Sequence, residues 1–141
     1  MTDSDPAAFE NDLIADMRAN GGVVTAGPLA GHPLLIMTSR GAKTGQPRRA
    51  ILTFTRDGVD YVVAASNGGA TTDPAWLLNL QADPVVSVEA EARTFQARAS
   101  ITDEATRDRL WGHHVEALPH FDEYAERSGR VIPMVRLTPA A

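Results

Sequence analysis

Apolar residues recur along the chain with two different periods, and these periods divide it into short strands and helices. A first helix is predicted from Pro6, capped by Asp5, because Phe9, Leu13 and Met17 recur every four residues. Asn20 and the two glycines that follow it end this helix. Its polar face lacks the basic residues typical of a membrane-surface helix, which favours packing on the body of the protein over contact with a membrane or a partner.

The strand predictions rest on runs that are apolar or alternating, rich in β-branched and aromatic residues, and bounded by turn residues. These runs cover residues 34–39, 49–56, 61–65, 85–89, 93–101 and 131–137. Asp57-Gly58 is a hairpin signal between the second run and the third, so those two strands should pair antiparallel.

The remaining periodic segments are predicted as helices. One begins after Asp73-Pro74 and ends at Asp83-Pro84; another is capped by Asp103, and Pro119 separates it from a second piece over residues 120–128. Most links between strands are short turns, which predicts an α+β protein with a mainly antiparallel sheet. About six short strands of this kind would close into a small barrel with flanking helices.

At 141 residues the chain is long enough for one domain with a substantial core. Residues 1–30 are predicted as the N-terminal helix and its linker, and residues 31–141 as the barrel domain. No apolar run approaches the roughly 20 residues that span a bilayer, and the acidic N-terminus is unlike a signal peptide. We therefore expect a cytoplasmic protein, with peripheral membrane contact through the N-terminal helix as the alternative. The sequence does not decide between a monomer and a homodimer.

Charge and cysteine content exclude several classes of function. The formal net charge is −5, which argues against nucleic acid as a partner because phosphate backbones are bound by basic faces. The chain has no cysteine, which excludes disulfides, thiolate metal sites, iron–sulfur clusters and cysteine nucleophiles.

Positive charge is concentrated in residues 39–49, which we call the cationic turn. It holds the chain's only lysine, Lys43, together with three arginines and two glycines. Glycines let backbone N–H groups face one ligand, and the cations suit its phosphate or carboxylate groups. A solvated hairpin turn is the alternative. An ATP-binding P-loop is disfavoured, because alanine precedes Lys43 and Pro47 leads back into a strand.

A histidine metal site and a serine hydrolase centre are weaker candidates for the functional site. His113 and His114 project about 100° apart on a helix and cannot share one ion, and no His-Glu-x-x-His motif is present, so no metal site is expected. We expect the four histidines, His32 and His120 included, to be solvated or to cap helices. Ser66 lacks a Gly-x-Ser-x-Gly context, but it precedes Asn67 and two glycines at a strand end.

Aromatic residues can also line a ligand site. Phe121 and Tyr124 lie three residues apart on the last helix and can face one side, either as core or as a wall over a flat ligand. Trp76 and Trp111 recur at helical spacing with leucines, which favours the core for both.

Three stretches together resemble the deazaflavin-dependent nitroreductase and quinone reductase family, whose members use coenzyme F420 on a split β-barrel. Residues 41–48, Gly-Ala-Lys-Thr-Gly-Gln-Pro-Arg, are similar to the family's first signature. Residues 64–69, Ala-Ala-Ser-Asn-Gly-Gly, look like its second, and residues 74–80 followed by Asp83-Pro84 look like its third. The resemblance runs from about Gly31 to the C-terminus, and the order of the signatures makes it specific.

The resemblance implies an F420H2-dependent reductase on a split β-barrel that passes a hydride to a small-molecule electron acceptor: a quinone, a nitro compound or an activated C=C bond in an enone or lactone. The anionic tail of the cofactor would meet the cationic turn, and its ring would lie near Ser66 and Phe121. Ser66 and Tyr124 would act in catalysis as donors. The residues expected to bind the cofactor are Ala42, Lys43, Thr44, Gly45, Arg48, Arg49, Thr53, Phe54, Ala64, Ala65, Ser66, Asn67, Ala75, Trp76, Asn79 and Phe121.

The chain departs from the family pattern at several positions that bear on the acceptor. Ala42 replaces an arginine, Thr53 and Leu118 stand where a tyrosine can occur, and Phe121 lacks a hydroxyl that Tyr124 keeps. Two rival functions stay open: an FMN-binding oxidoreductase of the same fold, and a non-catalytic protein that carries coenzyme F420.

Overall fold

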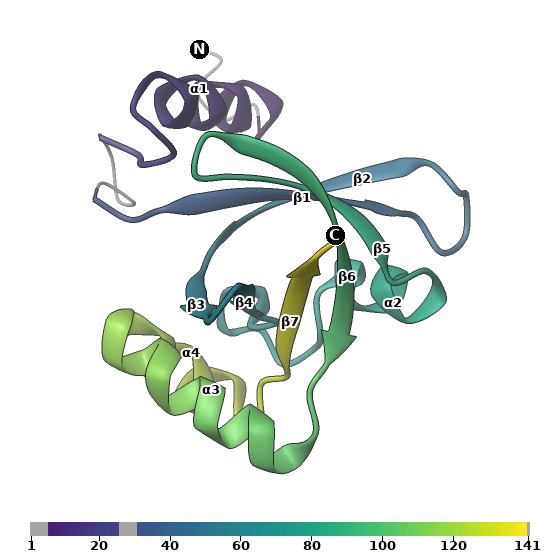
Figure 1. Cartoon of the computed structure of the whole chain (residues 1–141). Coiled ribbons are helices and arrows are strands. Elements are labelled where there is room, and N and C mark those ends of the chain that lie inside the picture. Colours follow the sequence, from purple (N-terminus) through teal and green to yellow (C-terminus); the bar gives the residue numbers. More distant parts are fainter. Residues whose placement is uncertain (1–5, 26–30, 141) are drawn as a thin grey trace.

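The computed structural model describes residues 6–25 and 31–140, and its centre is one antiparallel sheet curled into a half-barrel (Figure 1). Within this described part the sheet has seven strands, in the order β2-β1-β5-β6-β7-β4-β3. Every neighbouring pair is antiparallel. The strands are β1 Leu34–Arg40, β2 Pro47–Thr53, β3 Thr55–Asp57, β4 Asp60–Ala64, β5 Val85–Ala90, β6 Arg93–Ile101 and β7 Met134–Pro139.

The sheet curls because two strands that follow each other in the sequence lie at its opposite edges. β2 pairs with β1, whereas β3 pairs with β4, and only Phe54 separates them. The prediction of a single strand over residues 49–56, paired with residues 61–65, is therefore wrong for its first part. Phe54 is buried against Tyr61, with ring centroids 5.2 Å apart, and this packing turns the chain from one edge to the other.

Helices flank the half-barrel on two sides (Figure 1). Near the first strands lies α1, Pro6–Ala19, and against β3, β4 and β7 lie α3, Glu104–Ala117, and α4, His120–Ser128. The helix α2, Ala75–Ala82, follows the short 3₁₀ helix η1, Asn67–Gly69, and contacts β1. The predicted α+β architecture with a mainly antiparallel sheet is confirmed.

The first helix packs on the body of the protein, as the lack of a basic face predicted. Ile14 and Met17 are buried in a cluster with Leu34 and Ile36 of β1, while Leu13 is only partly buried. Arg18 adds a paired hydrogen bond from its guanidinium to the carboxylate of Glu89 on β5, at 2.8 and 2.7 Å. The predicted cap at residue 5 lies outside the described residues, as does the side chain of residue 9.

A buried histidine joins the helices to the sheet. His114 is fully buried, so the expectation that every histidine is solvated or caps a helix is wrong here. Its Nδ1 lies 2.9 Å from the hydroxyl of Thr55 on β3, and its ring packs against Phe121 with centroids 4.6 Å apart. Burial, with smaller effects of His120 and His113, lowers the pKa of His114 from 6.5 to about 4.

This histidine should make stability depend on pH. The unfolded chain binds a proton at His114 below about pH 6.5 while the folded chain does not until about pH 4, so stability present above pH 6.5 is lost as the pH falls towards 4. Between pH 7 and pH 5 we expect His114 to account for a loss of about 2 kcal/mol in the free energy of unfolding. Denaturant unfolding of the parent and of His114→Gln at both values measures it. The exposed neighbour provides the control, since His113→Gln should keep the pH dependence of the parent.

Candidate active site

Four segments that are distant in the sequence enclose a cavity of about 860 Å³. They are the cationic turn with β2, the end of β4 with η1, the start of α2, and the start of α4. A cavity of this size is in the range that holds drug-sized ligands and cofactors. The predicted site residues that line it are Ala42, Lys43, Thr44, Arg48, Arg49, Thr53, Ala64, Ser66, Asn67, Ala75, Trp76, Asn79, Phe121 and Tyr124.

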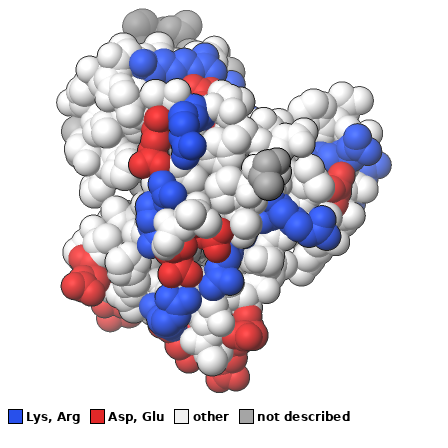
Figure 2. All heavy atoms as spheres, in the orientation of Figure 1, with Lys and Arg blue, Asp and Glu red and all other residues white. Residues whose placement is uncertain are grey.

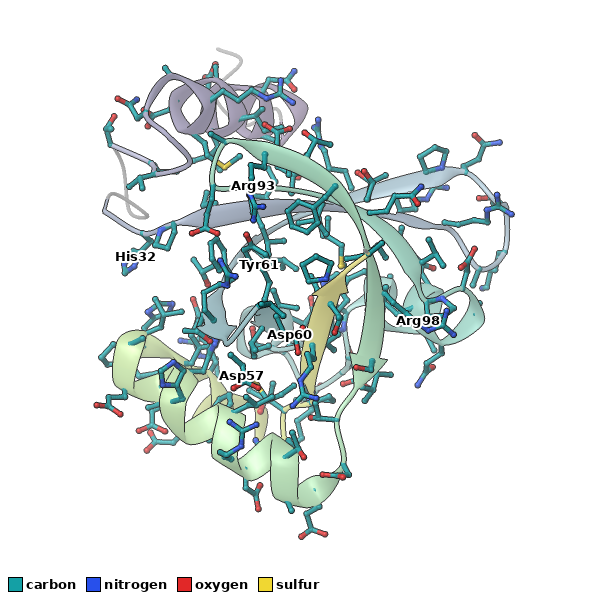
Figure 3. The ribbon with its side chains drawn as sticks, in the orientation of Figure 1. His32, Asp57, Asp60, Tyr61, Arg93 and Arg98 are labelled. Atoms are coloured by element: carbon teal, nitrogen blue, oxygen red, sulfur yellow. The ribbon has the colours of Figure 1, made fainter. Side chains whose placement is uncertain are left out.

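Three predicted cofactor contacts do not line this cavity. Phe54 and Ala65 are buried in the core of the half-barrel, where Phe54 packs on Tyr61. Figure 3 shows Tyr61 and Arg93 close together within the curve of the sheet, and the arginine donates to the tyrosine hydroxyl at 2.9 Å. Gly45 lines a second hollow of about 290 Å³, between the cationic turn and the end of α2.

A side chain from α2 holds the cationic turn in place. The backbone N–H of Gly41 donates to the carbonyl of Gln46 at 2.8 Å, and that of Gly45 donates back to Gly41 at 2.8 Å. Asn79, buried in α2, accepts from the backbone N–H of Ala42 at 3.0 Å through its Oδ1. The amide of Asn79 is thus engaged in positioning the turn, although the residue also lines the cavity.

The mouth of the cavity carries cations without counter-charges. Among the described residues, neither Lys43 nor Arg48 forms an ion pair, and both are exposed. Arg49 instead bridges to Glu10 of α1 at 3.0 Å. On the face seen in Figure 2 acidic and basic side chains are intermixed. Other arginines of the described residues do form ion pairs, such as Arg109 with Asp57. The two uncompensated cations fit an anionic ligand group at this end.

The opposite wall of the cavity is the loop from the end of β4 to α2, and Arg130 fixes its shape. The Nη2 of Arg130 donates to the carbonyls of Ala65, Ser66 and Thr72 at 3.0, 3.1 and 3.1 Å, and its Nη1 pairs with Asp73 at 2.8 Å. The hydroxyl of Ser66 has no hydrogen-bond partner among the described residues. Sequence analysis missed Arg130, because no local pattern links it to a loop more than fifty residues earlier.

The third wall is the first turn of α4. Phe121 is both core and cavity wall, since it is 5 % exposed yet lines the space. Tyr124 is half-buried and contacts Phe121 with ring centroids 5.1 Å apart. A Cβ at Gly69 would lie 3.3 Å from the Cα of Tyr124, and the residue has a φ of +88°, so glycine permits the helix to approach the loop.

His120 also lines the cavity beside these two aromatic residues, and sequence analysis did not include it in the site. It immediately precedes Phe121 and lies four residues before Tyr124, a spacing that places side chains on one helix face. Further lining comes from apolar side chains of β2 and α2, namely Ala50, Ile51, Leu52, Pro74 and Leu78. Trp76, predicted as core, is only partly buried and contributes to both core and cavity.

The residues present fit coenzyme F420, a flat deazaflavin with an anionic tail. The uncompensated cations Lys43 and Arg48 stand at one end of the cavity, and apolar side chains form walls suited to a ring. The hydroxyls of Ser66 and Tyr124 add donors elsewhere in the lining. No group of three or more metal-ligating side chains occurs in the described part of the chain, and no helix there is long and apolar enough to cross a membrane.

Comparison with known proteins agrees with this chemistry. The family model for F420H(2)-dependent quinone reductases matches residues 12–139. An F420H(2)-dependent quinone reductase of Mycobacterium tuberculosis is 38% identical over 109 residues, which cover 75% of this chain and 73% of that protein. A putative F420H(2)-dependent quinone reductase of Mycobacterium bovis gives the same values.

Solved structures show the same fold. The structure of an F420-H2 dependent reductase, FDR-A, superposes with a TM-score of 0.68 at 31% identity, covering 74% of this chain and 93% of that one. A structure described as a domain-swapped dimer gives 0.70 at 26% identity, covering 96% and 98%. The predicted split β-barrel and the expected cofactor, reduced coenzyme F420, are thus confirmed at the level of the family. The chain belongs to the F420H(2)-dependent quinone reductase family.

Proposed function

We propose that this protein transfers a hydride from reduced coenzyme F420 to a quinone. The observation that carries the proposal is that one cavity combines two exposed, uncompensated cations with the hydroxyl donors of Ser66 and Tyr124 in its lining. Family membership supports the use of the deazaflavin, and the names of the mycobacterial relatives support a quinone as acceptor. Nitro compounds and enones remain predictions from the earlier resemblance.

Each wall has a separate task in this proposal. Lys43 and Arg48 bind the anionic tail, and Trp76 and Phe121 exclude water from the faces of the ring. When bound, the reduced deazaflavin supplies the hydride. Ser66 and Tyr124 donate hydrogen bonds towards the reacting groups, where negative charge develops on an acceptor oxygen. The protein thus contributes position, a dry cavity and hydrogen-bond donors.

A direct test titrates the purified protein with coenzyme F420 and with FMN, and then follows oxidation of F420H2 by menadione. Tight binding of F420 with turnover supports the proposal. Preferential binding of FMN would favour the flavin alternative, and F420 binding without oxidation by any quinone would favour the carrier protein.

The cationic mouth predicts which substitutions weaken cofactor binding. Lys43→Ala and Arg48→Ala should each raise the dissociation constant for F420 about ten- to a hundredfold, because a charge-assisted hydrogen bond contributes roughly 1.5–3 kcal/mol. Added salt should weaken binding to the parent. Arg98, labelled in Figure 3, is exposed on β6 and does not line the cavity, so it provides a control of equal charge change. If Arg98→Ala and Arg48→Ala weakened binding equally, the mouth would not be the tail site.

The free hydroxyls predict a second pattern. Tyr124→Phe and Ser66→Ala should each slow hydride transfer more than they weaken F420 binding, since a positioned donor contributes about 10²–10⁴ in rate. Single-turnover oxidation of F420H2 and a separate binding titration measure the two quantities. Unchanged transfer rates in both variants would remove these hydroxyls from the mechanism.

A further inference from the structure

His120 lies in the cavity wall with its ring held on three sides by other rings. The centroids of Phe121 and Tyr124 are 4.7 and 5.4 Å from that of His120, and the ring of His32, which precedes β1, lies 5.9 Å away. These contacts join α4 to the segment before the first strand; Figure 3 marks His32 on the side of the sheet where the late helices lie. The ring of His120 is therefore positioned by packing rather than by hydrogen bonds.

Its two ring nitrogens have no hydrogen-bond partner among the described residues. The contrast is His114, six residues earlier on α3, whose Nδ1 is paired with Thr55 in the core. A half-buried polar group that lines a cavity without a protein partner is available to a ligand there.

The ring is uncharged at neutral pH. Burial, followed by the neighbouring His32, lowers the pKa of His120, and the carboxylate of Glu123 opposes this only in part. The pKa of His114, lowered by burial to about 4, leaves that neighbouring ring uncharged at neutral pH as well. Neutral imidazole offers one N–H donor and one acceptor nitrogen.

Resting on the proposed function, we propose that His120 is a catalytic residue that donates a hydrogen bond from its ring N–H to a carbonyl oxygen of the quinone. The quinone gains two electrons and one hydrogen nucleus as a hydride from F420H2, which leaves negative charge on a quinone oxygen. One proton from water then completes the hydroquinone, and the oxidised deazaflavin returns its second hydrogen to water as a proton, so protons balance overall. His120 keeps its own proton and stabilises the charge that develops.

The surroundings of His120 fit a quinone better than a more polar acceptor. A quinone is flat and apolar apart from its carbonyl oxygens, and the edges of Phe121 and Tyr124 offer aromatic contact on the same wall. An N–H donor between two aromatic rings matches a carbonyl at the rim of such a ring.

Variants at two histidines test the proposal. His120→Phe keeps the aromatic packing and removes the donor, and His120→Gln keeps an N–H. With menadione, His120→Phe should lower kcat/KM about ten- to a hundredfold, whereas His120→Gln should recover most of the loss. The dissociation constant for F420 should stay within about threefold of the parent in both. His113→Phe, exposed on the preceding helix, is the control and should match the parent.

A binding measurement separates this role from effects on turnover alone. Calorimetric titration of menadiol into the protein loaded with oxidised F420 should show about tenfold weaker binding in His120→Phe. Equal kcat/KM and equal menadiol affinity in His120→Phe and parent would overturn the proposal, as would equal losses in the Phe and Gln variants. If no quinone tested supported oxidation of F420H2 by the parent protein, the proposed function itself would fail, independently of the role of His120.

Discussion

The packing of Phe54 against Tyr61 is the constraint on which the rest of this structure depends. Phe54 is the one residue between β2 and β3, which follow each other in the sequence. β2 nevertheless pairs with β1 at one edge of the sheet, and β3 pairs with β4 at the other edge. Because the ring is buried in the core, the chain must cross from edge to edge at this residue, and the sheet closes into a half-barrel. The cavity then forms where β2 leaves one edge and the end of β4 approaches it from the other.

The walls of the cavity are loops, and long-range hydrogen bonds give them a fixed shape. Asn79 holds the backbone of Ala42 from 37 residues away, and Arg130 holds the carbonyls of Ala65 and Ser66 from 65 and 64 residues away. Such bonds satisfy backbone groups that would otherwise need water. They also leave the side chains of Lys43 and Ser66 free, so the groups that position the site differ from the groups that can meet a ligand.

Local signals in the sequence predicted most elements, and the resemblance of three stretches to a known family predicted much of the cavity lining. The cationic turn, the serine at the end of β4 and the start of α2 each carry glycine or proline, and it is their order along the chain that made the resemblance specific. The change of partner at Phe54 had no such signal, because the alternation of apolar residues is the same whichever strand lies opposite. The burial of His114 depends on Thr55, which lies 59 residues away. His120 could have been predicted as a site residue, because it lies four residues before Tyr124 and shares a helix face with it.

The departures from the family pattern now have different consequences. Leu118 is 3 % exposed in the core beneath α4 and does not line the cavity, so the loss of a tyrosine there changes packing behind the wall. Thr53 does line it, and a threonine leaves more space than a tyrosine at that point. On the α4 wall Phe121 has no hydroxyl, so the polar donors there are Tyr124 and His120. An acceptor held by this wall meets few donors and much aromatic surface, which favours a flat carbonyl compound over a strongly polar one.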